Sequence, residues 1–189
     1  MDISQVTPAL ESLFPAQTIE ANNDENWQIQ TEKVRLLVLL SADKSWLRIL
    51  APIASAAEAQ PLLSQLMEAN FDVTGAVRYA LSQNVLWSVF QHSFASLTEE
   101  DFRDAIAQIV AIAEKGLSQA FQQLVEVRIK QIIQASKAQG KSKEATYQTL
   151  ERFYQEGMLG DMDRAPEERN SFLAAWKMQL DRLWEEESS

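Results

Sequence analysis

The sequence predicts an α+β fold, an antiparallel β-meander of about five strands with helices, followed by a C-terminal helical extension. Within 27–94 the apolar residues recur with the period of strands, except for a helical stretch at 55–70. Within 96–140 the apolar period is helical over about ten turns, with no proline. The sequence that follows is more polar but again helical in composition. We therefore expect an α+β domain at 1–140 and a helical extension at 141–189.

The N-terminal segment is predicted to form one short helix and a loop. Residues 3–14 carry a helical apolar stripe. Pro8 fits the first turn, because proline lacks the N–H that a first-turn residue leaves unpaired, and Thr7 is then the expected N-cap. Residues 15–25 are polar and rich in turn formers, so a loop is expected there.

Five stretches have the composition of β-strands: 27–30, 34–40, 45–53, 77–81 and 85–94. In the third stretch, alternation places the side chains of Trp46, Arg48 and Leu50 on one face of the sheet. The residues between them lie on the opposite face. Pro52 cannot donate to a strand ladder, so we expect it at a strand end or an edge.

One helix is expected between the third and fourth strands. Because Pro61 is awkward inside a helix, we expect a short turn from Ser55 and a helix that begins at Pro61. Met67 belongs to the apolar face of this helix, and Asn70 is its expected C-cap.

The longest helical stretch is expected to begin at Thr98, whose hydroxyl can accept the free N–H of Asp101. Acidic residues at 99–101 suit the positive end of the helix dipole. Gly116 is the expected bend or break. Beyond Gly116 the apolar positions broaden to two faces, so this half is expected to be a platform for the C-terminal helices or for a second subunit.

The C-terminal extension is expected to contain two helices. The first is capped by Ser142 and stops at Gly157, and the second begins at Pro166. An amphipathic helix must bury its apolar stripe, here either on its own subunit or on a dimer mate or client. The stripe of the second helix contains Leu173, Trp176, Leu180, Leu183 and Trp184.

Composition excludes several classes of function. The net charge is −10, and a polyanion would be repelled, so nucleic acid is not expected as a partner. The chain has no cysteine, which excludes disulfides, thiol nucleophiles and cysteine-bound metals and suits a reducing cytosol. No secretory signal and no apolar run long enough to cross a bilayer are present, so we expect a cytoplasmic protein without a membrane partner.

Catalytic signatures are missing from the sequence. His92 is the single histidine, so a common histidine-based metal cluster is not expected. The five glycines are scattered and form no phosphate loop. Asp161 and Asp163 resemble the start of a calcium loop but lack the glycine and the terminal glutamate at the required spacing. We expect no enzymatic activity, no cofactor and no metal.

The chain resembles the class I type III secretion chaperone fold, which is shared with YbjN-like bacterial proteins. The residues that carry the resemblance are LLVLLSADKSWLRILAPI at 36–53, LLSQLMEANFDVTGAVRYAL at 62–81 and VLWSVFQHSFASLTEEDFRDAIAQIV at 85–110. Members similarly show a strand that ends in an Ala-Pro-type turn, a leucine-rich helix, a hairpin, and a helix that opens with a hydroxyl residue and acidic residues. The resemblance covers about 1–135 and not the extension.

This resemblance implies a small acidic homodimer that binds a partner polypeptide without ATP, through sheet faces and edges. The secretion role itself is not implied. The residues that we expect to bind a partner are Trp46, Arg48, Arg78, Trp176, Leu180 and Trp184. Two alternatives stay open: a small-molecule-binding protein or enzyme that uses the sheet face with Tyr79, and a structural assembly subunit.

Overall fold

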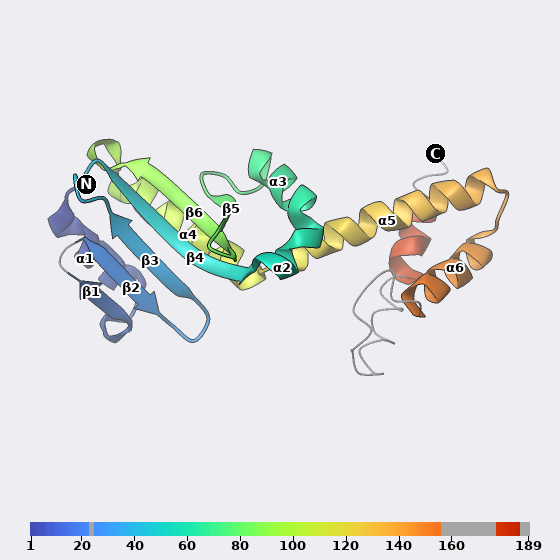
Figure 1. Ribbon diagram of the computed structural model, residues 1–189, viewed down its shortest axis with the longest axis horizontal. Helices are drawn as coiled ribbons and strands as arrows, with labels where there is room; N and C mark the ends of the chain where they lie inside the picture. Colours follow the sequence, from blue (N-terminus) through green and yellow to red (C-terminus); the bar gives the residue numbers. More distant parts are fainter. Residues whose placement is uncertain (23–24, 156–176, 186–189) are drawn as a thin grey trace. The chain divides into compact units, whose positions relative to one another are not determined.

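The computed structural model describes residues 1–22, 25–155 and 177–185, in two compact units (Figure 1). Unit 1 is Met1–Ala120 and unit 2 is Phe121–Ser189. The division lies within the long helical stretch, 20 residues before the boundary that the change in composition at Gly140 predicts.

Unit 1 is a six-stranded antiparallel sheet with helices, which confirms the predicted fold class. The strand order is β1-β2-β3-β4-β6-β5, so β1 and β5 are the edges. The elements are α1 (Ile3–Leu13), η1 (Ala16–Thr18), β1 (Ile19–Asn22), β2 (Asn26–Gln30), β3 (Arg35–Leu40), β4 (Trp46–Ser55), α2 (Ala56–Ala59), η2 (Gln60–Leu62), α3 (Leu63–Asp72), β5 (Arg78–Ser82), β6 (Val85–Ser93), η3 (Phe94–Ser96) and α4 (Glu99–Lys115).

The core of unit 1 lies between one face of the sheet and the helices α1 and α4. Alternate residues of the central strands point into this core, among them Leu36 and Val38 of β3 and Leu47 and Ile49 of β4. Helix α4 contributes residues that are fully buried, including Phe102. Because side chains of a strand alternate between its two faces, burial of this set leaves the intervening set on the other face.

The loop predicted at 15–25 is wrong in part, because its centre forms the edge strand β1. Ile19 pairs with Ile29 of β2 and packs against the core, whereas the rest of β1 is exposed. Backbone pairing with β2 and one anchored side chain outweigh the weak strand signal of this polar stretch. The sheet therefore has one strand more than the sequence indicated.

Helix α1 begins at Ile3, earlier than the predicted start at Pro8, which lies inside the helix. Asp2 is the N-cap residue, and its backbone N–H donates to Oε1 of Gln5 at 2.7 Å, as in a capping box. The predicted N-cap Thr7 has a tertiary role, since its Oγ1 accepts a hydrogen bond from Nε1 of the buried Trp27 at 2.9 Å. A buried indole N–H needs an acceptor, and helix α1 supplies it.

Pro52 lies within the ten-residue strand β4, so the prediction that it marks a strand end or an edge is wrong. The register of β4 with β6 shifts between Pro52 and Ala54, so a bulge accommodates the missing donor. After β4 the chain turns into α2, capped by the Ser55 hydroxyl, and then through η2 into α3, which begins at Leu63. The expected helix start at Pro61 falls in η2.

Helix α4 begins and ends as the sequence predicted. The backbone N–H of Asp101 donates to Oγ1 of Thr98 at 3.0 Å, which confirms the N-cap. The helix ends at Gly116, whose positive φ of 55° is open to glycine because it has no Cβ. A separate helix, α5 (Ser118–Ala138), follows.

Unit 2 contains most of α5, helix α6 (Lys143–Gln155) and a helical segment at 177–185. Ser142 caps α6, since its Oγ accepts the N–H of Ala145 at 3.2 Å. The expected stop at Gly157 and the start at Pro166 lie outside the described residues. A second hydrophobic core joins the three helices, with the buried residues Val125, Ile129, Ile133, Leu150, Leu180 and Leu183.

We predict that Thr98→Ala lowers the free energy of unfolding by about 1 kcal/mol, because an N-cap hydroxyl satisfies an otherwise free helix N–H. Urea denaturation followed by tryptophan fluorescence measures this loss. Ser96→Ala is the matched control, since Ser96 is exposed and precedes the helix, and we expect a change within about 0.5 kcal/mol. Equal stability of the Thr98 variant and the parent would contradict this assignment of the cap.

Candidate functional site

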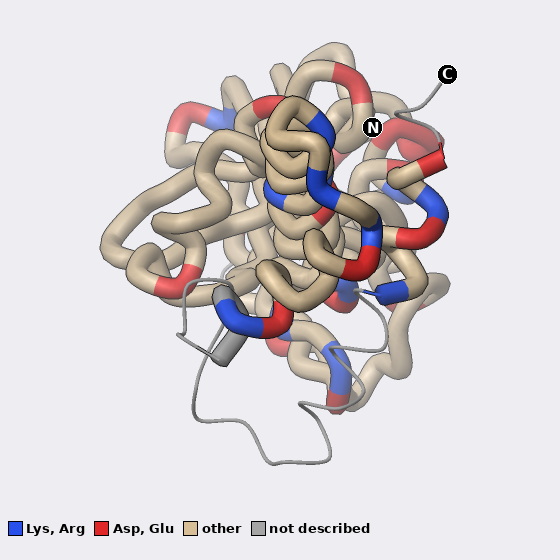
Figure 2. Tube along the Cα trace, turned by 90° about the vertical axis from the view of Figure 1, so that its right-hand side faces the viewer, with Lys and Arg blue, Asp and Glu red and all other residues tan. Residues whose placement is uncertain are grey.

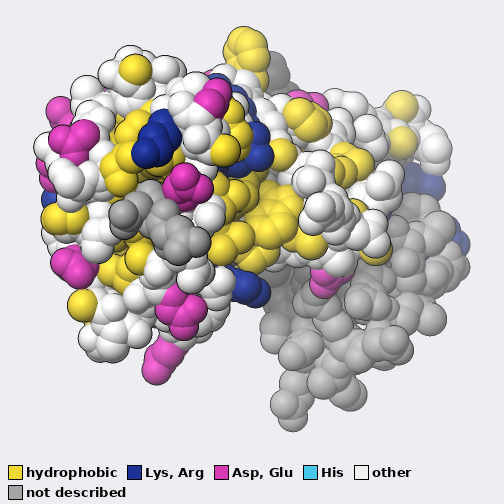
Figure 3. Space-filling model, turned by 60° about the vertical axis from the view of Figure 1, so that its left-hand side comes forward, with side chains coloured by type: hydrophobic (Ala, Val, Ile, Leu, Met, Phe, Trp, Pro, Cys, Tyr) yellow, Lys and Arg dark blue, Asp and Glu magenta, His cyan; other side chains and the backbone are white. Residues whose placement is uncertain are grey.

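The sheet of unit 1 has an apolar face that lies outside its core. We call it the open sheet face, and its apolar members are Leu37, Leu39, Leu50, Trp87 and Val89. Leu37, Leu50 and Val89 are register partners on β3, β4 and β6, so they form one row across the centre of the sheet. All are half-buried, and none belongs to the core cluster that includes α1 and α4. Figure 3 shows hydrophobic side chains that reach the surface of the protein.

A polar pair lies in the next row of the open sheet face. Arg48 and Gln91 are register partners, and the Nε and Nη2 of Arg48 donate to Gln91 Oε1 at 2.9 and 2.5 Å. The guanidinium carbon of Arg48 also lies 4.7 Å from the ring centroid of Trp46. Both contacts fix the orientation of the guanidinium. The structure thus brings the predicted residues Trp46 and Arg48 together, beside the apolar row.

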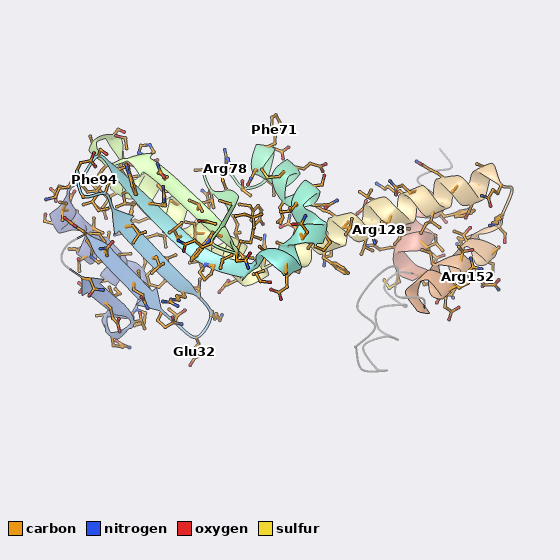
Figure 4. The ribbon with its side chains drawn as sticks, in the orientation of Figure 1. Glu32, Phe71, Arg78, Phe94, Arg128 and Arg152 are labelled. Carbon is orange, nitrogen blue, oxygen red and sulfur yellow. The ribbon has the colours of Figure 1, made fainter. Side chains whose placement is uncertain are left out.

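The side chain of Arg78 is held at the loop before β5 and not beside Trp46 and Arg48. It pairs in register with Val89, but its Nη1 donates to the carbonyl of Val77 at 2.6 Å and to the carbonyl of Gly75. The side chain therefore turns back to this loop, as Figure 4 shows beside α3. Its guanidinium stabilises that loop, so we do not place it with Trp46 and Arg48.

The β5 edge of the sheet is partly closed by Asn70 of α3. Its Oδ1 accepts the backbone N–H of Tyr79 at 2.7 Å, and its Nδ2 donates to the carbonyl of Tyr79 at 3.2 Å. These are groups that an edge strand otherwise leaves unpaired. The predicted C-cap role of Asn70 is therefore wrong, because α3 continues to Asp72 and the side chain binds the sheet edge.

Helix α3 exposes an apolar surface that the sequence did not indicate. We call Met67, Phe71 and Val73 the α3 patch; their side chains are 59%, 91% and 55% exposed. Figure 4 shows Phe71 at the end of α3, pointing away from the protein. Met67, which the sequence places on the apolar face of this helix, is exposed, because the burial falls on Leu62 and Leu66. The i, i+4 spacing of Met67 and Phe71 is a signal that could have revealed the patch.

Three of the residues predicted to bind a partner belong to the last helix: Trp176, Leu180 and Trp184. Trp176 lies outside the described residues. Leu180 is 1% exposed within the core of unit 2, and Trp184 packs against that core. In the described part of this helix, the apolar stripe is thus buried on its own chain. We therefore leave Leu180 and Trp184 out of the partner-binding surface of unit 1.

The lowered pKa values in unit 1 belong to carboxyl groups at caps and turns, and the raised one belongs to Tyr79 of β5. The hydrogen bond from Thr98 holds the pKa of the Asp101 carboxyl below its ordinary value. This contribution to stability is present at neutral pH and is lost as the pH falls through the lowered pKa. Burial raises the pKa of the Tyr79 phenol, which therefore stays neutral at neutral pH and is no ready base.

The described residues contain no group of three or more His, Asp or Glu placed to hold a metal ion. Among them, no helix is both long and apolar enough to cross a membrane. Figure 2 shows basic and acidic positions interspersed along the described chain, without a large region of one sign. The open sheet face combines apolar side chains with one oriented arginine, a composition that is typical of surfaces through which proteins bind other molecules.

Comparison with protein families shows what kind of binding protein this is. The model of the "Tir chaperone protein (CesT) family" matches residues 12–116. The chain belongs to this family. It is accordingly a non-enzymatic, protein-binding protein of the chaperone type, as expected from the resemblance, and chaperones of this family are cytoplasmic. Comparison with curated protein sequences gave no match.

Several solved structures match part of this chain, with TM-scores below 0.5. The ExsC–ExsE complex matches with a TM-score of 0.47 and 18% identity, over 60% of this chain and 92% of that chain. The HopA1–SchA chaperone–effector complex matches with a TM-score of 0.45 and 10% identity, over 61% and 97%. The Yersinia pestis chaperone SycH in complex with a fragment of YscM2 matches with a TM-score of 0.46 and 15% identity, over 61% and 99%.

We predict that Asn70→Ala destabilises unit 1 by about 1–2 kcal/mol, because two backbone groups of Tyr79 lose their partners at a partly buried edge. Hydrogen exchange should show faster exchange of the Tyr79 amide, with the amides of β3 unchanged. Asn22→Ala, at an exposed position on the opposite edge strand, is the control and should leave both measurements unaltered. An unchanged Tyr79 amide would argue against this role for Asn70.

Proposed function

We propose that the chain binds an extended segment of a partner polypeptide on the open sheet face, with the free edge of β1 alongside, and that it does so as a homodimer. Client binding on this face is inferred from one observation, the apolar row outside the core that consists of Leu37, Leu50 and Val89. An extended client segment can cover such a row with alternate side chains and leave its other side chains in solvent.

The polar groups beside this row suit a peptide backbone. Arg48 keeps donors beyond those used by Gln91, because a guanidinium has five N–H groups. A peptide carbonyl or an acidic client side chain is their natural acceptor. Trp46 and Trp87 flank the site with large flat surfaces, which contribute contact area at little cost in side-chain entropy.

The two sheet edges differ in availability. On β5, Asn70 already binds the outward N–H and carbonyl of Tyr79. Among the described residues, strand β1 pairs with β2 alone, and its other side is an edge of the sheet. Backbone pairing with a client strand therefore favours β1 over β5.

The homodimer is proposed through the α3 patch. Phe71 is 91% exposed and lies one turn from Met67, so a monomer would present both to water. Large exposed apolar groups of this kind mark interaction sites. The helix is also fixed to the sheet edge by Asn70, which gives a second copy a rigid surface to pack on. Self-association buries the patch without a further partner.

We predict that Leu50→Thr with Val89→Thr weakens client binding at least about tenfold, because each substitution removes about 1 kcal/mol of apolar contact while keeping a residue that favours strands. The probe is fluorescein-labelled lactalbumin, reduced and carboxymethylated so that it stays unfolded, followed by fluorescence anisotropy. Val127→Thr is the matched control, since Val127 is exposed on α5 in unit 2. Failure of the parent chain to bind the probe, or equal binding by both variants, would refute the assignment of this face.

We predict that Met67→Asp with Phe71→Asp converts a dimer into a monomer, because carboxylates cannot be buried unpaired in an apolar contact. Light scattering after size exclusion at micromolar concentration measures the mass. Val127→Asp changes an exposed apolar residue outside the patch, and this variant should stay dimeric. A monomeric parent chain at this concentration rules out the proposed dimer.

A further inference from the structure

The strands of unit 1 carry few charged residues, and most of these are arginines. The six strands hold four charged side chains: Glu20, Arg35, Arg48 and Arg78. Alternation places all four on the open sheet face, because their neighbours in sequence point into the core. The guanidinium of Arg78 is bound to the loop before β5, so Arg35 and Arg48 are the two that this face presents. The open sheet face is therefore locally basic, although the chain has a net charge of −10.

The opposite side of unit 1 is acidic. Helix α4 covers the core face of the sheet and carries two basic residues against five acidic ones, which are Glu99, Glu100, Asp101, Asp104 and Glu114. Figure 3 shows basic side chains beside exposed hydrophobic ones on one side of the protein. Since the two sides of the unit differ in sign, an acidic molecule is attracted to the open sheet face and repelled from the side of α4.

Arg35 and Arg48 lie on opposite sides of the apolar row. Leu37 and Leu50 are register partners within that row, and each arginine lies two residues before one of these leucines. Because β3 and β4 run antiparallel, the two arginines are displaced from the row in opposite directions, each by about 7 Å along the strands. Along the strands, the face therefore reads basic, apolar, basic.

Each of these arginines lies opposite a glutamine and not a carboxylate. Arg35 pairs in register with Gln30, and Arg48 with Gln91. Oε1 of Gln91 accepts hydrogen bonds from the Nε and Nη2 of Arg48, so the amide orients the guanidinium without neutralising its charge. Among the described residues of unit 1, the one ion pair is that of Arg103 with Glu99 on α4. The described part of the chain thus supplies no carboxylate to either arginine of the open sheet face.

The remaining donors of Arg48 suit a carboxylate better than a carbonyl. Beyond the contacts with Gln91, the guanidinium keeps both N–H groups of Nη1 and one of Nη2. Two parallel N–H groups match the two oxygens of a carboxylate, and such charge-assisted hydrogen bonds are roughly twice as strong as neutral ones. A peptide carbonyl has one oxygen and leaves the positive charge unpaired. The chemistry of the face therefore favours acidic side chains.

We propose that the open sheet face selects acidic client segments, in which an apolar residue has an acidic residue two positions before it and another two positions after it. Residues i, i+2 and i+4 of an extended chain share one face and repeat at the spacing of the rows in the sheet. The apolar side chain covers Leu37, Leu50 and Val89, and the two carboxylates reach Arg35 and Arg48. This inference rests on the proposed client site and adds its charge selectivity.

The test compares three fluorescein-labelled peptides with identical flanks and the centres Glu-Thr-Ile-Thr-Glu, Gln-Thr-Ile-Thr-Gln and Lys-Thr-Ile-Thr-Lys. Anisotropy with the full chain measures the three affinities. We expect the glutamate peptide to bind at least about fivefold more tightly than the glutamine peptide, and the lysine peptide to bind most weakly. Raising the salt concentration from about 0.1 M to about 1 M should reduce this preference, because the screening length falls from about 10 Å to about 3 Å.

Three variants assign the selectivity to the arginines, with the ratio of the glutamate-peptide to the glutamine-peptide affinity as the readout. Arg35→Gln with Arg48→Gln should bring the ratio close to one. Gln91→Glu keeps Arg48 in place and gives it an internal carboxylate, so this variant should lower the ratio at least about twofold without removing a cation. Lys115→Gln is the matched control, because it removes a positive charge from the end of α4 on the other side of the sheet and should keep the ratio of the parent.

The outcomes separate this inference from the proposed function on which it rests. Equal affinity for the glutamate and glutamine peptides, or an unchanged ratio in the double arginine variant, overturns the charge selectivity. If lactalbumin binding still depends on Leu50 and Val89 in that case, the client site stands and the selectivity alone fails. If neither lactalbumin nor any peptide binds, both fail. A thymidine oligonucleotide that binds more tightly than the glutamate peptide, and through the same arginines, overturns the choice of an acidic polypeptide.

Discussion

Burial of one face of the sheet is the constraint on which the rest of unit 1 depends. Helices α1 and α4 cover alternate residues of β2, β3 and β4. The indole of Trp27 on β2 also binds α1, through its hydrogen bond to Thr7. Because strand side chains alternate, the same packing leaves Leu37, Leu50 and Val89 uncovered. The surface proposed to bind a client is therefore a consequence of how the core is built.

The polar contacts of helix α3 determine which surfaces of unit 1 are available to other molecules. Asn70 binds the edge of β5, which withdraws that edge from pairing and holds α3 in a defined place. Phe71, its neighbour in sequence, is then left in solvent. One edge of the sheet is closed, one stays available, and an apolar patch stands beside the closed edge. The proposed client-binding and dimer surfaces are thus kept apart within one small unit.

Unit 2 buries its apolar side chains between helices and not against a sheet. Its helices have no sheet to cover, so α5, α6 and the 177–185 helix bury their apolar stripes on one another. The third helix is held by two leucines, two exposed ion pairs and the Lys137 contacts.

The sequence by itself determined the elements whose signals are local. Alternation in β4 predicted its two faces, Thr98 the start of α4, Ser142 the start of α6 and Gly116 the break between two helices, because caps, turns and periodicity act over a few residues. Only the tertiary structure decided the rest. Strand β1 exists through pairing with β2, a bulge opposite β6 accommodates Pro52, Asn70 serves an edge and not a cap, and Leu180 is buried on its own chain. Each depends on the segment that pairs with it or packs against it, which the periodicity and caps of a single segment do not encode.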